Sequence, residues 1–370
     1  IRRPPRSTQS RSSAASDVYK RQLLCSLYNY MAFKIPKNFL NLSHLIGDDS
    51  SLVQGAGGNT SYKENGEMWV KASGKWLSEA GKRDIFVLVN SEKIRDNVIK
   101  DSANPLDGVI IENSVLRPSI ETALHALMPH KVVIHTHPVD LLSWLVRDDG
   151  YENLTKLLKD LYWGWVPYIR PGVELAREVQ KVIQEGQVDI LLLGSHGIVV
   201  GGEDCASAFD LMNRVLARCS RPPRKILIQD NFIIERLADY FKMRLPKYKK
   251  IHSLALDKIA YDYCNNENGV LYPDQAVFLG SKIPCYDGEM HEQIIAEYVE
   301  NNPHLLFIVV KGKGVLIAKD AKMDVDEMLL CHTEVLMRID SGKKLQYLTE
   351  KDVDRLLDWE PEKYRQSMEN

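Results

Sequence analysis

The chain has 370 residues, which is enough for two domains with substantial hydrophobic cores. Its share of hydrophobic residues, 44%, is typical of a soluble globular protein, and no apolar run is long enough to predict a membrane span. The six cysteines form no CxxC pair, which indicates reduced thiols and a cytoplasmic location and argues against a cysteine-based zinc site.

Residues 1–30 differ in composition from the rest of the chain. Ile1–Gln22 is rich in Arg, Ser and Pro and resembles translated sequencing-adapter read-through, so Met31 is a plausible start. The alternative is a disordered basic arm for a nucleic acid or a membrane surface. Six basic residues and one acidic residue lie in 1–30, which leaves a net charge of −7 for the remainder. This acidic remainder is not expected to bind nucleic acid or a membrane.

Residues 31–220 predict a domain that mixes strands and helices. Strands are expected at 59–63, 68–71, 84–89 and 131–137, and as a pair over 189–200 that bends at 194–197. Helices are expected at 119–128, 139–147, 154–161, 173–185 and 203–218. The run Arg221–Lys225 contains two prolines and is the best candidate for a linker.

Residues 225–370 predict a second, smaller α/β domain that resembles a degenerate copy of the first. Leu192–Val200 aligns with Val309–Ile317, and Pro129–His135 aligns more weakly with Pro273–Leu279, which therefore reads as a strand. In this alignment three histidines of the first domain have no counterpart in the second, so the copy would lack a metal site. His135, His137 and His196 are replaced by Leu279, Ser281 and Lys313 respectively. Two unrelated β-turn-β-helix units explain the pattern equally well.

Three histidines lie in apolar segments that predict strands. His135 and His137 are two positions apart, so both imidazoles point to one face of a strand and can share a cation. His196 lies between glycines in a second apolar segment. Three neutral imidazoles leave a fourth coordination position open, as in catalytic zinc sites. The alternative is a set of core histidines, but burying several imidazoles without partners is costly.

Two polar turns and the start of a helix supply further candidates. Gly55–Ser61 is a glycine-rich turn into a strand, without the features of a Walker loop or a dinucleotide fingerprint. Lys71–Lys75 is a second turn with two cations, and Ser119 is the expected N-cap of a helix. Together these segments supply the parts of a phosphate pocket, although each alone is typical of an ordinary turn. Glu121 is either a complement to the helix dipole or a general base.

In this order, the segments GGNTS, KASG, PSIETALHA, HTHP and LLGSHGIVVGG resemble the class II aldolase/adducin superfamily of zinc-dependent sugar-phosphate aldolases and epimerases. The stretch after Pro273 resembles the aldolase half of bifunctional rhamnulose-1-phosphate aldolase/dehydrogenases. The resemblance implies a central, mainly antiparallel sheet flanked by helices, a homo-oligomer, and a C–C lyase for a sugar phosphate or a related keto-sugar.

The resemblance also assigns roles to individual residues. It implies that His135, His137 and His196 hold Zn²⁺ or another divalent metal, and that Glu121 is the catalytic acid/base. The positions expected to bind the substrate phosphate are Gly58, Asn59, Ser73, Gly74 and Ser119. The zinc would stabilise an enediolate while Glu121 moves the proton.

Two departures from the family pattern put the substrate's phosphate in doubt. Ile120 stands where the aldolases usually have a second serine, and the stretch from Glu121 to His135 is short. Lys71 or Lys75 would compensate as a phosphate partner.

Other reactions and roles remain open. A tyrosine commonly protonates the aldehyde in this superfamily, and Tyr151, Tyr162 and Tyr168 are the candidates. The alternatives to a lyase are an epimerase, dehydratase or decarboxylase that uses the same enediolate. Glu121 favours the lyase, because the epimerases tend to carry aspartate there. A non-catalytic module like adducin is disfavoured because the histidines and Glu121 are all retained.

Overall fold

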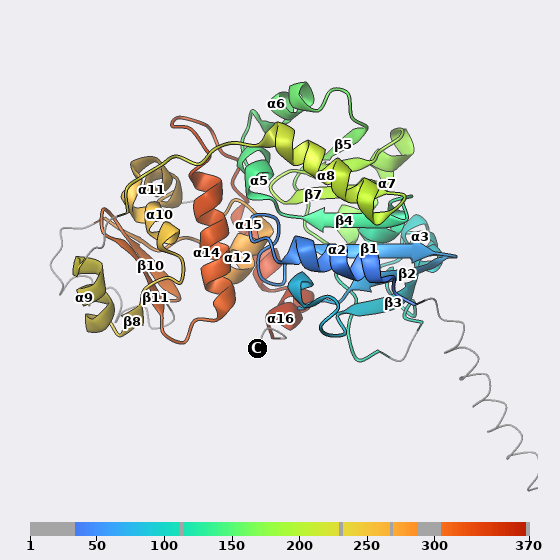
Figure 1. Cartoon of the computed structure of the whole chain (residues 1–370), viewed down its shortest axis with the longest axis horizontal. Coiled ribbons are helices and arrows are strands. Elements are labelled where there is room, and N and C mark those ends of the chain that lie inside the picture. The colour runs from blue at the N-terminus through green and yellow to red at the C-terminus, as the bar shows by residue number, and fades with distance from the viewer. Residues whose placement is uncertain (1–33, 112–113, 229–231, 267–268, 288–304, 368–370) are drawn as a thin grey trace, which may run out of the picture. The chain divides into compact units, whose positions relative to one another are not determined.

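A seven-stranded sheet forms the centre of the N-terminal half in the computed structural model, which describes residues 34–111, 114–228, 232–266, 269–287 and 305–367 (Figure 1). The strands are β1 (Asn59–Glu64), β2 (Glu67–Lys71), β3 (Phe86–Asn90), β4 (Val132–Thr136), β5 (Trp163–Val166), β6 (Ile190–Leu193) and β7 (Gly197–Gly202). They follow the order β3-β2-β1-β4-β7-β6-β5, and every pair is antiparallel except β5 with β6. The predicted mainly antiparallel sheet is confirmed.

Helices cover both faces of this sheet, so the fold has three layers. The helices of this half are α2 (Lys37–Gly47), η1 (Leu77–Glu79), α3 (Ser91–Ile99), α4 (Thr122–Leu127), α5 (Val139–Leu145), α6 (Gly150–Leu157), α7 (Val173–Glu185) and α8 (Cys205–Cys219). α3, α4 and α7 contact one another on one face, whereas α2, α5 and α8 pack together on the other (Figure 1). Apolar side chains on both faces of β4 are therefore buried, which explains its unbroken apolar run.

The register of the central strands brings functional candidates together. In the antiparallel β1–β4 pair, Asn59 lies opposite His135, and in the β4–β7 pair His135 lies opposite Val199. The tight β6–β7 connection places His196 immediately before β7, next to the end of β4. The sheet therefore brings residues from three separate sequence segments together at the C-terminal end of β4.

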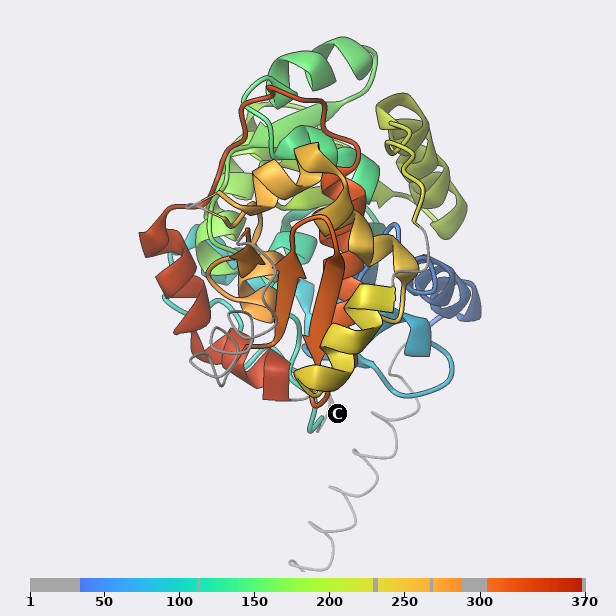
Figure 2. The same cartoon turned by 90° about the vertical axis from the view of Figure 1, so that its left-hand side faces the viewer.

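The C-terminal half contains a second sheet in the order β8-β11-β10-β9, best seen in Figure 2. Its elements are α9 (Phe232–Tyr240), β8 (Met243–Arg244), η2 (Lys249–His252), α10 (Ser253–Leu256), α11 (Lys258–Cys264), α12 (Pro273–Leu279), β9 (Cys285–Tyr286), β10 (Phe307–Val310), β11 (Gly314–Ala318), α14 (Met323–Leu336), α15 (Glu350–Leu357) and α16 (Glu360–Ser367). This arrangement confirms the predicted second, smaller α/β domain.

The prediction of a strand at Pro273–Leu279 is wrong, because these residues form helix α12. Tyr272 is the extended N-cap and Pro273 occupies the first turn, where proline is tolerated. All seven residues of α12 are buried, and a short apolar run does not distinguish a buried helix from a buried strand. The β10–β11 hairpin followed by α14 does repeat the pattern of β6–β7 and α8. The repeat alignment through 273–279 fails, so we abandon the interpretation of a full metal-free copy.

Several other boundaries differ from the sequence-based expectations. The helix expected at 119–128 is the shorter α4, and the helix expected at 154–161 is α6, which begins at Gly150. The strand β5 and the helices α2 and α3 were not among the expected elements. β5 is short and pairs in parallel with β6, so it lacks a hairpin turn that would signal it.

The two halves share one hydrophobic core. Val139 and Leu142 of α5 pack in the same cluster as Phe307 of β10 and Met328 of α14. An ion pair of 2.8 Å between Arg338 and Asp140 connects the same parts. Contacts group the described residues from Lys37 onward as one unit. The boundary between 31–220 and 225–370 therefore stays a prediction.

The residues expected to be extraneous, 1–30, lie outside the described residues. Among the residues that the structure does describe, no helix combines the length and the apolar character needed to cross a bilayer.

Candidate metal centre and pocket

The three predicted histidines come together at the C-terminal end of β4. One nitrogen atom from each of His135, His137 and His196 lies within 4.8 Å of the others, and all three side chains are buried. The Nε2 atoms of His135 and His137 are 3.1 Å apart. On the far side of its ring, His135 Nδ1 lies 2.9 Å from the carbonyl oxygen of Ile198, which can only accept a hydrogen bond. The Nε2 atom of a neutral His135 therefore presents a lone pair to the cluster.

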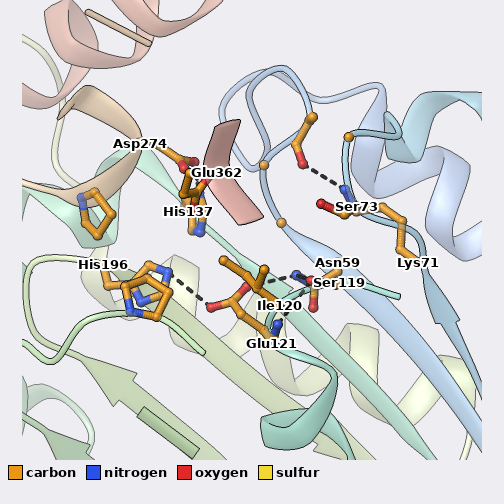
Figure 3. Close-up of a pocket in the computed structure, with 16 residues that line it drawn as sticks. Asn59, Lys71, Ser73, Ser119, Ile120, Glu121, His137, His196, Asp274 and Glu362 are labelled. Carbon is orange, nitrogen blue, oxygen red and sulfur yellow. Dashed lines mark hydrogen bonds and ion pairs between the residues drawn. The ribbon is translucent and has the colours of Figure 1, made fainter. Parts of the chain in front are cut away.

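Glu121 contacts this cluster directly. Its Oε2 atom lies 3.2 Å from His135 Nε2. Its Oε1 atom lies 3.3 Å from His196 Nε2 (Figure 3). Glu121 is the residue before α4 and has no side-chain capping bond, so the carboxylate faces the histidines rather than the helix end. The predicted N-cap role of Ser119 is wrong, because the helix begins three residues later. The Ser119 hydroxyl instead accepts a hydrogen bond of 3.3 Å from the backbone amide of Glu121.

Charge couples Glu121 to the histidines. Burial opposes the negative charge of Glu121, but the imidazoles of His135 and His196 hold the pKa of its carboxyl well below the usual range. Burial also opposes protonation of His135. The adjacent Glu121 carboxylate outweighs this effect of burial and raises the pKa of the His135 imidazole. Burial lowers the pKa of His196 to about 3. At neutral pH the site therefore offers an ionised carboxylate and a neutral His196.

The donor set fits a divalent cation. Neutral imidazoles are preferred ligands of Zn²⁺ and similar metals, and three of them leave room for a further ligand. Nδ1 of His196 is buried and makes no hydrogen bond with any described residue, and Oε1 of Glu121 likewise makes none. A buried carboxylate beside three imidazoles would stabilise a positive charge at their centre, which a metal would supply.

The predicted phosphate-binding residues surround one pocket beside the histidines. Gly58, Asn59, Ser73, Gly74 and Ser119 all line it, together with Glu121 and His196. Gly58 has a φ of +57°, and a Cβ there would lie 3.0 Å from the carbonyl oxygen of His135, so the close approach of the turn to β4 requires glycine. The Asn59 side-chain amide donates to Glu121 Oε2 at 2.9 Å and thereby also fixes the carboxylate.

The two lysines expected to compensate for Ile120 are placed differently, because Lys71 lines the pocket and Lys75 does not. Lys71 is buried, and its ammonium group donates to the carbonyl oxygens of Ala56 at 2.7 Å and Lys75 at 2.6 Å. It therefore ties the glycine-rich turn to the second turn and places a positive charge in the wall of the pocket. Lys75 is not among the residues that line the pocket, whereas Ile120 is (Figure 3).

The C-terminal half supplies pocket residues that the sequence did not reveal. Pro273 and Asp274 of α12 and Glu362 of α16 line the same pocket. Figure 3 shows Asp274 and Glu362 beside His137, across the pocket from Ser73 and Lys71. These residues are far from the histidine motifs in the sequence and belong to no recognisable motif, so no local signal could have found them.

None of the three candidate tyrosines lines this pocket. Tyr151 is 49% exposed and packs against Trp163 and Trp165, and Tyr162 is 60% exposed. Tyr168 packs against the small cluster around Leu348 and Leu356, where burial raises the pKa of its hydroxyl. A proton donor from this set is therefore not supported within a single chain.

Comparison with known proteins identifies the N-terminal half. Residues 38–220 match the family described as the Class II Aldolase and Adducin N-terminal domain. This part of the chain belongs to the class II aldolase/adducin superfamily. It contains the expected metal ligands, the expected acid/base and all five expected phosphate-binding residues.

Individual relatives cover the same half of the chain. A protein of Bacillus subtilis named uncharacterized oxidoreductase YuxG is 33% identical over 202 residues, which are 48% of this chain but 28% of that protein. The L-fuculose phosphate aldolase of Methanococcus vannielii is 27% identical over 182 residues, covering 47% of this chain and 87% of that one. A solved class II aldolase domain from Thermoplasma acidophilum is 28% identical, with a TM-score of 0.44 over 51% of this chain and 96% of that one.

Proposed function

We propose that the chain is a divalent-metal-dependent aldolase that forms or cleaves a C–C bond beside a ketone in a sugar phosphate or a related keto-sugar. The observation that carries this proposal is the contact of one buried carboxylate, Glu121, with two of three converging imidazoles. Family membership and relatives named fuculose phosphate aldolase support it.

In this proposal His135, His137 and His196 would hold the cation, which would supply Lewis-acid polarisation of a carbonyl oxygen. Glu121 would accept the proton that leaves the substrate and later return it, since its carboxylate is ionised and lies at the pocket surface. Asn59 would hold the Glu121 carboxylate in position through its 2.9 Å hydrogen bond. The wall formed by α12 and α16 would exclude water from this proton transfer.

The pocket bears on whether the substrate is phosphorylated. Ser73 and Ser119 offer hydroxyl donors and Lys71 contributes a positive charge, as a phosphate requires. Asp274 and Glu362 add two carboxylates to the same pocket, and Ile120 adds an apolar surface. Because like charges repel in a buried site, these carboxylates disfavour a phosphate dianion and favour a keto-sugar without one.

Aldol cleavage assays test the proposed function. The metal-reconstituted full chain should release an aldehyde from members of a ketose panel, each offered with and without a terminal phosphate. Treatment with a chelator should abolish the release, and added Zn²⁺ or another divalent metal should restore it. Epimerised products without aldehyde release, or turnover that is unaffected by the chelator, would contradict the proposal.

A further inference from the structure

Asp274 contacts the candidate metal centre from outside the family domain. Its Oδ2 atom lies 3.0 Å from Nδ1 of His137, and both side chains are less than 9% exposed. His137 Nδ1 is on the side of the ring away from Nε2, the atom that faces His135. Asp274 thus touches the outward edge of one of the three imidazoles.

Helix α12 holds Asp274 in a defined place. Every residue of the helix is buried; Ala276 packs against Leu348 and Leu356, and Val277 and Phe278 belong to the main core of the C-terminal half. The glycine-rich turn fits closely around the contact between Asp274 and His137, because a Cβ on Gly57 would lie 2.9 Å from Asp274 Oδ2. A rigid element and a close-fitting turn therefore fix the carboxylate against His137.

A carboxylate at this position has a specific chemical consequence. Its charge stabilises a proton on Nδ1, which leaves Nε2 of His137 with the lone pair that a metal ligand needs. Carboxylates that contact metal-binding histidines in this way orient the ring and increase its basicity. His135 is oriented by the Ile198 carbonyl instead, and Nδ1 of His196 has no hydrogen-bond partner among the described residues. His137 is thus the ligand whose orientation depends on the C-terminal half.

We propose that Asp274 is a positioning residue for the metal centre, so that the C-terminal half completes a site whose ligands all lie in residues 38–220. This inference rests on the proposed metal-binding function. A simpler alternative makes Asp274 only an acidic residue in the first turn of α12, where it complements the helix dipole. The two accounts differ in their effect on metal affinity.

The test compares Asp274→Ala and Asp274→Asn in the full chain, with Asp324→Asn as a matched control. Asp324 is also a buried aspartate near the start of a helix of the C-terminal half and packs against the same glycine-rich turn, at Gly55. It is not among the residues that line the pocket. The Zn²⁺ dissociation constant is measured by chelator competition, and the visible spectrum is recorded after Co²⁺ loading.

We expect Asp274→Ala to bind Zn²⁺ about 10- to 100-fold more weakly, the usual effect of losing such a partner. Asp274→Asn should recover part of the affinity, because the amide oxygen still accepts a hydrogen bond from the N–H group at Nδ1. Asp324→Asn should bind like the wild type, and all variants should keep the wild-type Co²⁺ spectrum and the wild-type melting temperature without metal.

Unchanged affinity in both Asp274 variants would overturn the inference while leaving the metal site intact. A changed Co²⁺ spectrum in them would make Asp274 a direct ligand and would also overturn it. Failure of the wild-type chain to bind about one ion is a different result, because it contradicts the proposed metal function itself.

Discussion

Replacing His196 with alanine should remove most of the bound metal and the activity with it. Wild-type protein is expected to hold about one divalent ion per chain, since three imidazoles converge within 4.8 Å. Loss of a residue that only orients a ligand already costs about 10- to 100-fold in affinity, so loss of a ligand should cost more. Metal content after gel filtration, measured by elemental analysis, checks the result.

His130→Ala is a suitable control for this variant. His130 is also a buried histidine next to a carboxylate, with Nε2 3.0 Å from Asp189, but it lies outside the three-histidine cluster. The His130→Ala variant should retain about one ion per chain. Full metal occupancy in His196→Ala would show that the ligands have been assigned wrongly, whatever the occupancy of His130→Ala.

Glu121→Gln should retain the metal and the fold while losing most of the activity. Glutamine has the shape of glutamate but does not accept a proton in the neutral pH range, and general acid–base catalysis typically contributes about 10²- to 10⁴-fold. The Asn59 amide donates to Glu121 Oε2, and the glutamine side-chain oxygen can accept the same hydrogen bond. Steady-state kcat, metal content and the melting temperature are the measurements.

Glu327→Gln serves as the matched control for Glu121→Gln. Glu327 is buried to a similar degree and pairs with Lys247 and Tyr248, on the C-terminal half and away from the pocket. Its kcat should match the wild type. A kcat for Glu121→Gln within a few-fold of the wild type would show that this carboxylate only balances charge in the site.

The convergence of the three histidines was predictable because its signal is local. The alternation of side chains in a strand places His135 and His137 on one face wherever the strand lies in the fold. His196 follows from the glycines around it, which mark the tight connection between β6 and β7. Helix α7 was predicted at both ends, since Gly172 precedes its amphipathic pattern and Gly186 follows it.

The remaining features depend on contacts between distant segments. Asp274 reaches His137 only because α12 packs against the glycine-rich turn, and a buried apolar run does not reveal whether it is a strand or a helix. Lys71 lines the pocket, and its ammonium group also donates to the carbonyl oxygens of Ala56 and Lys75, two contacts that link the turns of the site. Neither partner could be inferred from the spacing of the residues.

X-ray absorption at the zinc edge of the metal-loaded full chain tests the central claim most directly. The account predicts one zinc per chain, bound only by nitrogen and oxygen atoms at about 2.0–2.2 Å, with multiple-scattering features from three imidazoles. A sulfur shell at about 2.3 Å would place the zinc on cysteines instead. That shell, or a spectrum with one imidazole or none, would contradict a metal centre built from His135, His137 and His196.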